Sequence, residues 1–176
     1  MIPETTPVGS DRVTSHVDFE RDRGVSHVSV RSGVGRLSIY ADDPRREMAH
    51  IFALLSEAGI NVFLIKIHED CIGFAVEADE VPRCVELCET QALRYAVVRR
   101  CALVSVVAPS MRDLSGVLWR IIGSFWERQI EVLELADAYN AVSCLVQESD
   151  AEVASRTLAE VFGVEVADKP GPLDPW

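Results

Sequence analysis

An internal repeat constrains this sequence more than any other feature. When the chain is shifted by 70 residues against itself, two amphipathic segments coincide without a gap. Each carries apolar residues at the i, i+3, i+4 and i+7 spacing of one helix face. These residues are Met48, Ile51, Phe52 and Leu55 in the first copy and Leu118, Ile121, Ile122 and Phe125 in the second. Asp43 and Asp113 precede the segments, and each is expected to cap its helix. The chain therefore contains two copies of one unit.

The repeat continues past this helix into two expected strands and a second helix. The strands are Val62–Ile67 and Cys71–Val76 in the first copy, and the Val132–Leu135 region and Ala141–Val146 in the second. Apolar stripes predict the second helices, at Val81, Cys84, Val85 and Cys88 and at Ala154, Thr157, Leu158, Val161 and Phe162. Opening and closing strands complete the copies: Val25–Val30, Arg36–Ala41 and Tyr95–Val98 in the first, Cys101–Val107 and Val164–Val166 in the second. Ser32–Gly35 is expected to be a turn.

This order of elements predicts an α+β chain built from two ferredoxin-like βαββαβ units. In each unit an antiparallel sheet is covered by two helices on one face. The bare sheet face is expected to be buried against the other unit or a second chain. We expect a disordered tail over residues 1–12, a first unit over 13–98 with extra N-terminal strands, a second unit over 99–166 and a tail over 167–176. Whether the strand-like segment Val13–Phe19 pairs with its own sheet or the other is left open.

Charge and cysteine content restrict the function and the setting. The chain has 17 Lys and Arg against 28 Asp and Glu, a net charge of −11. A phosphate backbone would be repelled by that balance, so nucleic-acid binding is disfavoured, and so is a basic membrane-binding face. No signal peptide or apolar stretch of membrane-spanning length is found. The odd number of cysteines, five, favours reduced thiols and a cytoplasmic protein.

Several motifs resemble a known family. Cys101–Val107 followed by Met111–Val117, with an Asp-x-x-Gly-Val pattern, is similar to the start of an ACT domain. Glu131–Val146 resembles the second and third ACT strands, and Leu55–Val62 resembles the family's helix-to-strand junction. Roughly residues 13–166, nearly the whole chain, are similar to the tandem ACT regulatory regions of aspartate kinases, particularly those that respond to lysine or diaminopimelate. The resemblance implies a non-catalytic amino-acid sensor or regulatory subunit, dimeric through its ACT sheets, with an aspartate kinase catalytic subunit as a candidate partner.

An amino-acid effector is a zwitterion, and two groups of residues would recognise it. Backbone N–H groups at a helix start would bind the α-carboxylate, because they carry the positive end of the helix dipole. The strand after the helix would supply acceptors for the α-ammonium. The residues expected to bind ligand are Met111, Arg112, Asp113, Ser115, Gly116, Val117, Leu118, Glu131 and Val132 in the second copy and Asp42, Asp43, Asn61 and Val62 in the first. No catalytic residue, cofactor or metal is expected.

Three alternatives remain beside this hypothesis. The first copy lacks the glycine that Gly116 provides in the second, so a degenerate, ligand-free pair acting as a dimerisation scaffold is the main one. Cys84 and Cys88 have the spacing of a thiolate pair for zinc, but they also lie on a buried apolar stripe. A small enzyme is disfavoured because the four histidines, His16, His27, His50 and His68, have no partner at catalytic spacing. Trp119 and Trp126 would contact a partner or extend the core.

Overall fold

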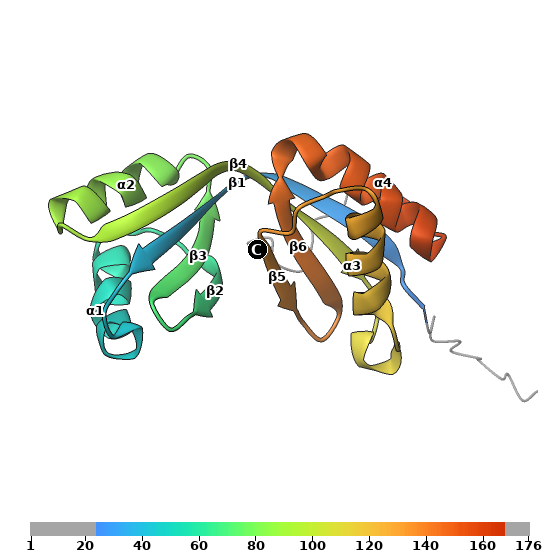
Figure 1. Ribbon diagram of the computed structural model, residues 1–176, viewed down its shortest axis with the longest axis horizontal. Coiled ribbons are helices and arrows are strands. Elements are labelled where there is room, and N and C mark those ends of the chain that lie inside the picture. The colour runs from blue at the N-terminus through green and yellow to red at the C-terminus, as the bar shows by residue number, and fades with distance from the viewer. Residues whose placement is uncertain (1–23, 168–176) are drawn as a thin grey trace, which may run out of the picture.

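The computed structural model describes residues 24–167, in two helix-covered units joined by long strands (Figure 1). The segment Val13–Phe19 lies outside the described residues. The elements in chain order are β1 (His27–Tyr40), α1 (Pro44–Glu57), β2 (Phe63–Ile67), β3 (Cys71–Glu77), α2 (Val81–Thr90), β4 (Arg94–Val107), the 3₁₀ turn η1 (Met111–Asp113), α3 (Val117–Glu127), β5 (Glu134–Asp137), β6 (Ala141–Gln147), the 3₁₀ turn η2 (Glu148–Asp150), α4 (Ala151–Phe162) and β7 (Val166–Ala167).

One sheet runs through both units in the order β2-β3-β1-β4-β6-β5, and β7 pairs in parallel with β1. Its two central strands, β1 and β4, each have 14 residues and run antiparallel to one another. At about 3.3 Å per residue each spans roughly 45 Å. That length exceeds what one small unit needs, and both strands therefore pass from one unit into the other (Figure 1). The predicted fold class, antiparallel sheets with helices on one face, is confirmed.

The two ends of β1 belong to different units. Residues 34–40 pair with β3 and lie in the first unit, which has the strand order β2-β3-β1-β4. Residues 27–31 pair instead with residues 103–107 of β4, beside β7, in the second unit. The segment Val25–Val30, expected to open the first copy, thus forms part of the sheet of the second. Local periodicity predicted the strand correctly but could not show its partner.

The turn expected at Ser32–Gly35 is wrong, because β1 is continuous there. Gly33 has a φ of 76°, and the β1–β4 register shifts between Arg31 and Val34 and again before Arg36. These are the features of a β-bulge, which bends a strand without ending it. Arg100, at the corresponding place in β4, also has a positive φ, 57°. A G1-type bulge and several types of tight turn both use a residue with positive φ, so the same glycine is compatible with either.

Each unit has its own core between its helices and its sheet. In the first unit, α1 and α2 contribute Ile51, Leu55, Cys84 and Cys88 to a cluster with Ile72 and Phe74 of β3. In the second, α3 and α4 contribute Val117, Ile121, Phe125 and Leu158 to a cluster with Val104 and Val142. The helix stripes predicted from the sequence are only partly confirmed. Leu118 and Ile122, expected to face the core, are 48% and 39% exposed.

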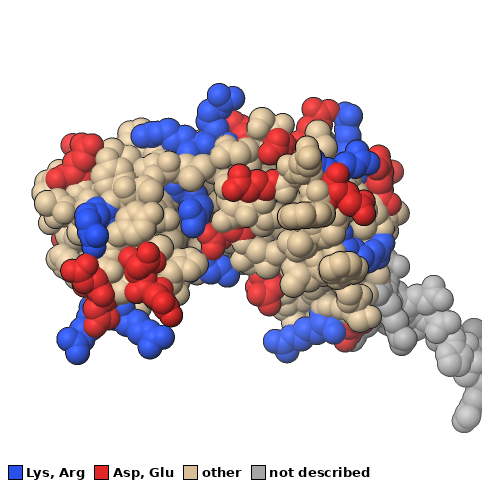
Figure 2. All heavy atoms as spheres, in the orientation of Figure 1, with Lys and Arg blue, Asp and Glu red and all other residues tan. Residues whose placement is uncertain are grey.

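A third cluster joins the units on the sheet face that carries no helices. Val34, Ala75, Cys101, Leu103 and Leu145 are buried there, with Phe63 and Leu133 packed against them. The Arg36 Nε lies 2.9 Å from Glu134 Oε2, so an ion pair links β1 to β5 across the junction. The surface is hollowed between the two units along the lower side of the view in Figure 2. The clustered residues of the bare sheet faces are therefore covered within the chain, which is one of the two arrangements that the sequence left open.

Candidate functional site

A pocket of about 630 Å³ opens at one end of the second unit. It lies between the loop that leads from β4 to α3 and the turn that joins β5 to β6. It is lined by Met111, Arg112, Leu114, Gly116, Val117, Leu118, Leu135, Asp137, Ala138, Tyr139 and Val142. Five residues predicted from the sequence are among them: Met111, Arg112, Gly116, Val117 and Leu118. We call this the α3 pocket.

The loop over the α3 pocket is fixed by two backbone contacts with the opposite turn. The Met111 N–H donates to the Tyr139 carbonyl at 2.9 Å, and the Ala108 N–H donates to the Asn140 carbonyl at 2.9 Å. The Met111 side chain is 8% exposed and anchors the 3₁₀ turn in the core. Because β4, β5 and β6 are adjacent strands of one antiparallel sheet, the loop after β4 and the β5–β6 turn meet at the same end.

The expectation that Asp113 caps α3 is wrong. Asp113 closes the 3₁₀ turn, and α3 begins only at Val117, with Gly116 as its N-cap residue at a φ of 74°. Left-handed backbone of this kind favours glycine, because other residues meet a Cβ clash there. Asp113 and Ser115 are exposed in the same loop and do not line the pocket. The extra residues before the helix lengthen the loop and leave room for the pocket.

The α3 pocket combines two opposite charges with apolar walls. The Arg112 guanidinium lies 5.9 Å from the centroid of the Tyr139 ring. Arg112 and Asp137 are both exposed, and among residues 24–167 neither takes part in a salt bridge. Leu114 and Leu135 are half-buried walls. A guanidinium pairs with a carboxylate, and a carboxylate pairs with an ammonium. The arrangement therefore suits a small zwitterion with an apolar side chain.

The first unit has a smaller pocket at the position related by the 70-residue shift. Its volume is about 430 Å³, and it is lined by Asp42, Asp43, Pro44, Arg45, Ile67, His68 and Glu69. We call it the α1 pocket. Asp43 is the N-cap of α1 as predicted, and its Oδ1 accepts from the Arg46 N–H at 3.3 Å. Asp42 pairs with Arg94 at 2.8 Å. Since α1 begins at Pro44, directly after its cap, the loop is shorter and the pocket is tighter than the α3 pocket.

The remaining predicted residues lie at the other ends of the helices. Glu131 and Val132 follow α3, and Asn61 and Val62 follow α1. An α-helix of 11 residues is about 16 Å long, so neither pair lines the loop pocket of its own unit. Asn61 and Val62 line a separate hollow of about 350 Å³ with Gly59. The residues that the sequence assigned to one ligand site in each unit therefore lie at opposite ends of the helix.

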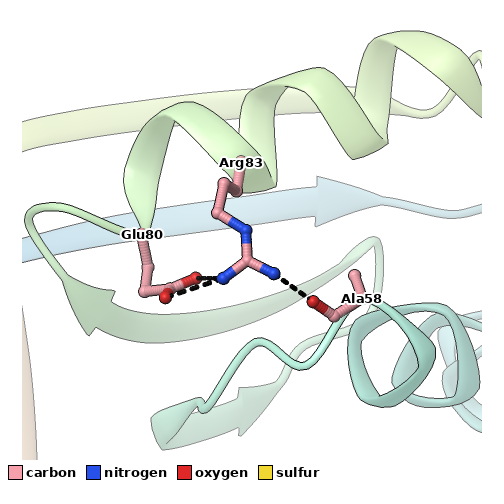
Figure 3. A network of polar contacts seen from close by, with 3 residues as sticks. All are labelled: Ala58, Glu80 and Arg83. Carbon is pink, nitrogen blue, oxygen red and sulfur yellow. Dashed lines mark hydrogen bonds and ion pairs between the residues drawn. The ribbon is translucent and has the colours of Figure 1, made fainter.

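An arginine of α2 holds the loop that carries Asn61 and Val62 (Figure 3). Arg83 Nη1 donates to both carboxylate oxygens of Glu80, at 2.9 and 2.8 Å, and Nη2 donates to the Ala58 carbonyl at the end of α1. A carbonyl in the last turn of a helix has no partner within the helix. The Arg83 contact satisfies one such carbonyl and ties α1 to α2.

Asp137, Tyr139 and Leu135 line the α3 pocket but were not predicted. The signal was present, because the 70-residue repeat predicts both the β4–α3 loop and the β5–β6 turn. Periodicity alone does not indicate at which end of the sheet a turn lies. Adjacent antiparallel strands place alternate turns at opposite ends, so the predicted topology could have brought the loop and this turn together.

Other candidate groups are buried or dispersed. All five cysteines are buried and free, and desolvation raises the pKa of Cys84 to about 11 and that of Cys144 to about 12. Cys84 and Cys88 lie in the core of the first unit, as the apolar reading predicted. Within residues 24–167 no three His, Cys, Asp or Glu side chains gather as a metal site would require. No helix in that range is long and apolar enough to cross a membrane. His16 lies outside the described residues.

Comparisons with known proteins agree with this fold. Residues 96–160 match the ACT domain family. Aspartokinase 1 of Bacillus subtilis is 28% identical over 160 residues, which cover 87% of this chain and 37% of that protein. Among solved structures, a chain of the aspartokinase alpha and beta subunits gives a TM-score of 0.75 at 20% identity, covering 80% of this chain and 100% of that one. The regulatory subunit of aspartate kinase from Thermus thermophilus gives a TM-score of 0.71 at 18% identity, covering 79% of this chain and 99% of that one.

Proposed function

From this likeness to the regulatory parts of aspartate kinases, we propose that the chain is a non-catalytic regulatory protein that binds an amino acid. The observation that carries the proposal is the α3 pocket, in which Arg112 and Asp137 face one space of about 630 Å³. Arg112 would pair with the α-carboxylate of the ligand, helped by backbone N–H groups at Gly116, Val117 and Leu118. Asp137 would accept from the α-ammonium. Asp113 and Ser115 would support the loop rather than contact the ligand.

The α1 pocket supports an effector of the lysine branch. Its lining includes three carboxylates, of which Asp42 is paired with Arg94 and Asp43 with Arg46, so Glu69 is the carboxylate that would pair with a ligand. Lysine and diaminopimelate each carry a second ammonium group, and carboxylates are the side chains that pair with it. We therefore propose that the α1 pocket recognises a basic amino acid. Glu131, Val132, Asn61 and Val62 lie away from both pockets, and they would contact a ligand only if it also touched a second unit.

The proposal extends to partners and setting. The chain spans about a third of the length of Aspartokinase 1 of Bacillus subtilis. We propose that it regulates an aspartate kinase catalytic subunit in the cytoplasm, within aspartate-family amino-acid biosynthesis. A ligand that shifts the two units relative to each other would change a partner's activity by a coupling free energy of about 1–3 kcal/mol. We propose that the chain acts as a homodimer.

Thermal unfolding and calorimetric titration with amino acids test the binding proposal. Lysine, diaminopimelate, threonine, methionine and the branched-chain amino acids are the ligands to compare. A ligand present at 100 times its Kd stabilises a protein by about 2.7 kcal/mol. For a chain of this size that raises the Tm by roughly 5–11 °C. Arg112→Ala should abolish binding in the α3 pocket, and Glu69→Gln should weaken binding of a basic ligand in the α1 pocket.

Arg156→Ala is the matched control, because Arg156 is exposed on α4 and its one ion pair within residues 24–167 is with the exposed Glu152. It should leave every titration unchanged. If no amino acid gives heat or a Tm shift, the sensor proposal fails. The ligand-free scaffold would then be the better account, since the first copy has no glycine at the position of Gly116. A pull-down that recovers a kinase catalytic subunit without any added ligand would favour that scaffold.

A further inference from the structure

The outer side of α3 exposes two tryptophans. Trp119 and Trp126 are 78% and 83% exposed, so the possibility that they extend the core is excluded. Trp126 also borders a hollow of about 430 Å³ beyond the last turn of α3, which it lines with Gln129, Ile130 and Glu131. We call this the α3-end hollow. It lies at the opposite end of the helix from the α3 pocket and shares no lining residue with it.

The first unit has a corresponding hollow at the end of α1. The 70-residue shift relates the four residues of the α3-end hollow to four that line the first one: Ser56, Gly59, Ile60 and Asn61. Gly59 and Gln129 both have left-handed backbone, with φ of 64° and 58°, so the chain turns alike after the two helices. The two hollows therefore share a backbone conformation. They differ in that a serine and an asparagine of the first are a tryptophan and a glutamate in the second.

A guanidinium from within the chain lies at the edge of the first hollow (Figure 3). Arg83 of α2 donates from Nη2 to the Ala58 carbonyl and from Nη1 to the Glu80 carboxylate. A Cβ built on Gly59 would lie 4.0 Å from the Arg83 Nη2, so this group borders the lining of the hollow. The C-terminal end of a helix carries the negative end of its dipole, which a cation stabilises. The first unit thus shows which chemical group this place accepts.

The second unit has no equivalent arginine. The 70-residue shift places Val153 of α4 at the position of Arg83, and Val153 is 48% exposed. Arg128 corresponds to Ala58, and within residues 24–167 no side chain donates a hydrogen bond to its carbonyl. The Arg128 guanidinium itself lies 3.7 Å from the Glu160 carboxylate of α4. In the described part of the chain, no guanidinium is therefore bonded to this end of α3.

The two side chains that differ between the hollows suit a guanidinium from outside the chain. The flat face of a guanidinium stacks on an aromatic ring, and its N–H groups pair with a carboxylate. Trp126 supplies the ring and Glu131 supplies the carboxylate, and both are exposed. Within residues 24–167 Glu131 takes part in no salt bridge. The net charge of −11 also favours a basic partner over an acidic one.

The α3-end hollow does not suit a free amino acid. An α-carboxylate needs a donor, and neither Lys nor Arg lines the hollow. The N–H groups of Arg128, Gln129 and Ile130 all donate to carbonyls in the last turn of α3, at 3.3, 3.1 and 2.9 Å. We therefore propose that the hollow binds the arginine side chain of a partner protein, with the guanidinium against Trp126 and Glu131. The proposal does not depend on amino-acid binding in either pocket.

Two capped pentapeptides test the chemistry of the ligand. One is acetyl-Ala-Ala-Arg-Ala-Ala-amide, and the other has citrulline at its centre, which has nearly the shape of arginine without the charge. In NMR spectra of the full chain, the arginine peptide should shift the Trp126 indole N–H and the Gln129 amide in a saturable way. Titration to about 10 mM detects a Kd of about 1 mM, which is the range expected for one side chain. The citrulline peptide should leave both signals unchanged.

Variants of the second unit locate the site. Trp126→Ser with Glu131→Asn installs the residues of the first hollow and should raise the Kd of the arginine peptide at least about tenfold. Val153→Arg should place a guanidinium where Arg83 lies in the first unit, and it should abolish peptide binding although Trp126 and Glu131 are intact. Val153→Gln is the matched control and should bind the peptide as the wild type does. All three positions are exposed, so the Tm of each variant should stay close to that of the wild type.

Several results would overturn the proposal. These are a wild type that shows no saturable shift with the arginine peptide, a citrulline or lysine peptide that binds as tightly, and a Val153→Arg chain that binds as the wild type does. Free arginine that binds more tightly than the peptide would make the hollow an amino-acid site instead. A peptide that dissociates a dimer of the chain in sedimentation would show that a second copy occupies the hollow.

Discussion

Gly35 lies in β1 just after the bulge, where the first residue of α2 packs directly on the strand. A Cβ built on Gly35 would lie 2.2 Å from the Val81 Cγ2. Carbon atoms in contact are normally 3.5–4.0 Å apart, so one of the two groups would have to move by more than about 1 Å. Val81 is 2% exposed and is stiff because it is branched at Cβ. Gly35→Ala should therefore overpack the junction between β1 and α2.

The expected cost follows from that clash. Overpacking a filled core costs about 1–3 kcal/mol, and this contact belongs in the upper part of that range. Gly→Ala also restricts the unfolded chain, which restores about 0.5 kcal/mol. The net loss should be about 2 kcal/mol in the free energy of unfolding, or roughly 4–8 °C in Tm for a chain of this length. Urea denaturation followed by far-UV circular dichroism measures it as a lower midpoint with an unchanged slope.

Gly73→Ala is the matched control within the same sheet. The nearest atom to its added Cβ is the Arg36 Nη2 at 3.8 Å, which is ordinary contact, so its stability should stay within about 0.5 kcal/mol of the wild type. Val81→Ala should remove the penalty of Gly35→Ala in a double-mutant cycle, because the clashing methyl is gone. If Gly35→Ala is no less stable than Gly73→Ala, the proposed close packing of α2 on β1 is refuted.

Further predictions concern the ion pair between the units, the α1–α2 contact and a buried thiol. Arg36→Ala should lower the free energy of unfolding, measured by urea denaturation, by about 2–3 kcal/mol, because it leaves Glu134, whose side chain is 10% exposed, without its partner. Arg156→Ala removes an exposed ion pair and should lower it by under about 0.5 kcal/mol. Equal losses in the two variants would contradict this reasoning. Arg83→Ala should cost about 1 kcal/mol and speed amide exchange at the end of α1, and unchanged exchange would argue against its capping role. Burial raises the pKa of Cys144 from 9.0 to about 12, so the folded state keeps a proton that the unfolded state releases. The stabilisation from this group is full below pH 9 and falls as the pH rises from 9 to about 12. This alkaline loss of stability should be smaller in Cys144→Ala.

The repeat was sufficient to predict most of the secondary structure. Matching stripes at Ile51 and Leu55 and at Ile121 and Phe125 identified the helices, because the period of an amphipathic helix is a property of neighbouring residues. Part of the candidate site followed in the same way. Met111, Arg112 and Gly116 were recognised from one short motif and do line the α3 pocket.

The sequence by itself thus determined that two like units are present, what each is built from, and which loop precedes α3. Only the tertiary structure decided that β1 and β4 run through both units, that Asp137 and Arg112 line the same pocket, and that Trp119 and Trp126 remain outside the core. The physical reason is the range of the interactions. Periodicity and capping depend on residues within a turn or two, whereas strand pairing depends on which edges are available once the whole sheet has formed. A helix face is buried or exposed according to how the helix is rotated on that sheet, and the stripe on α3 was wide enough to allow either.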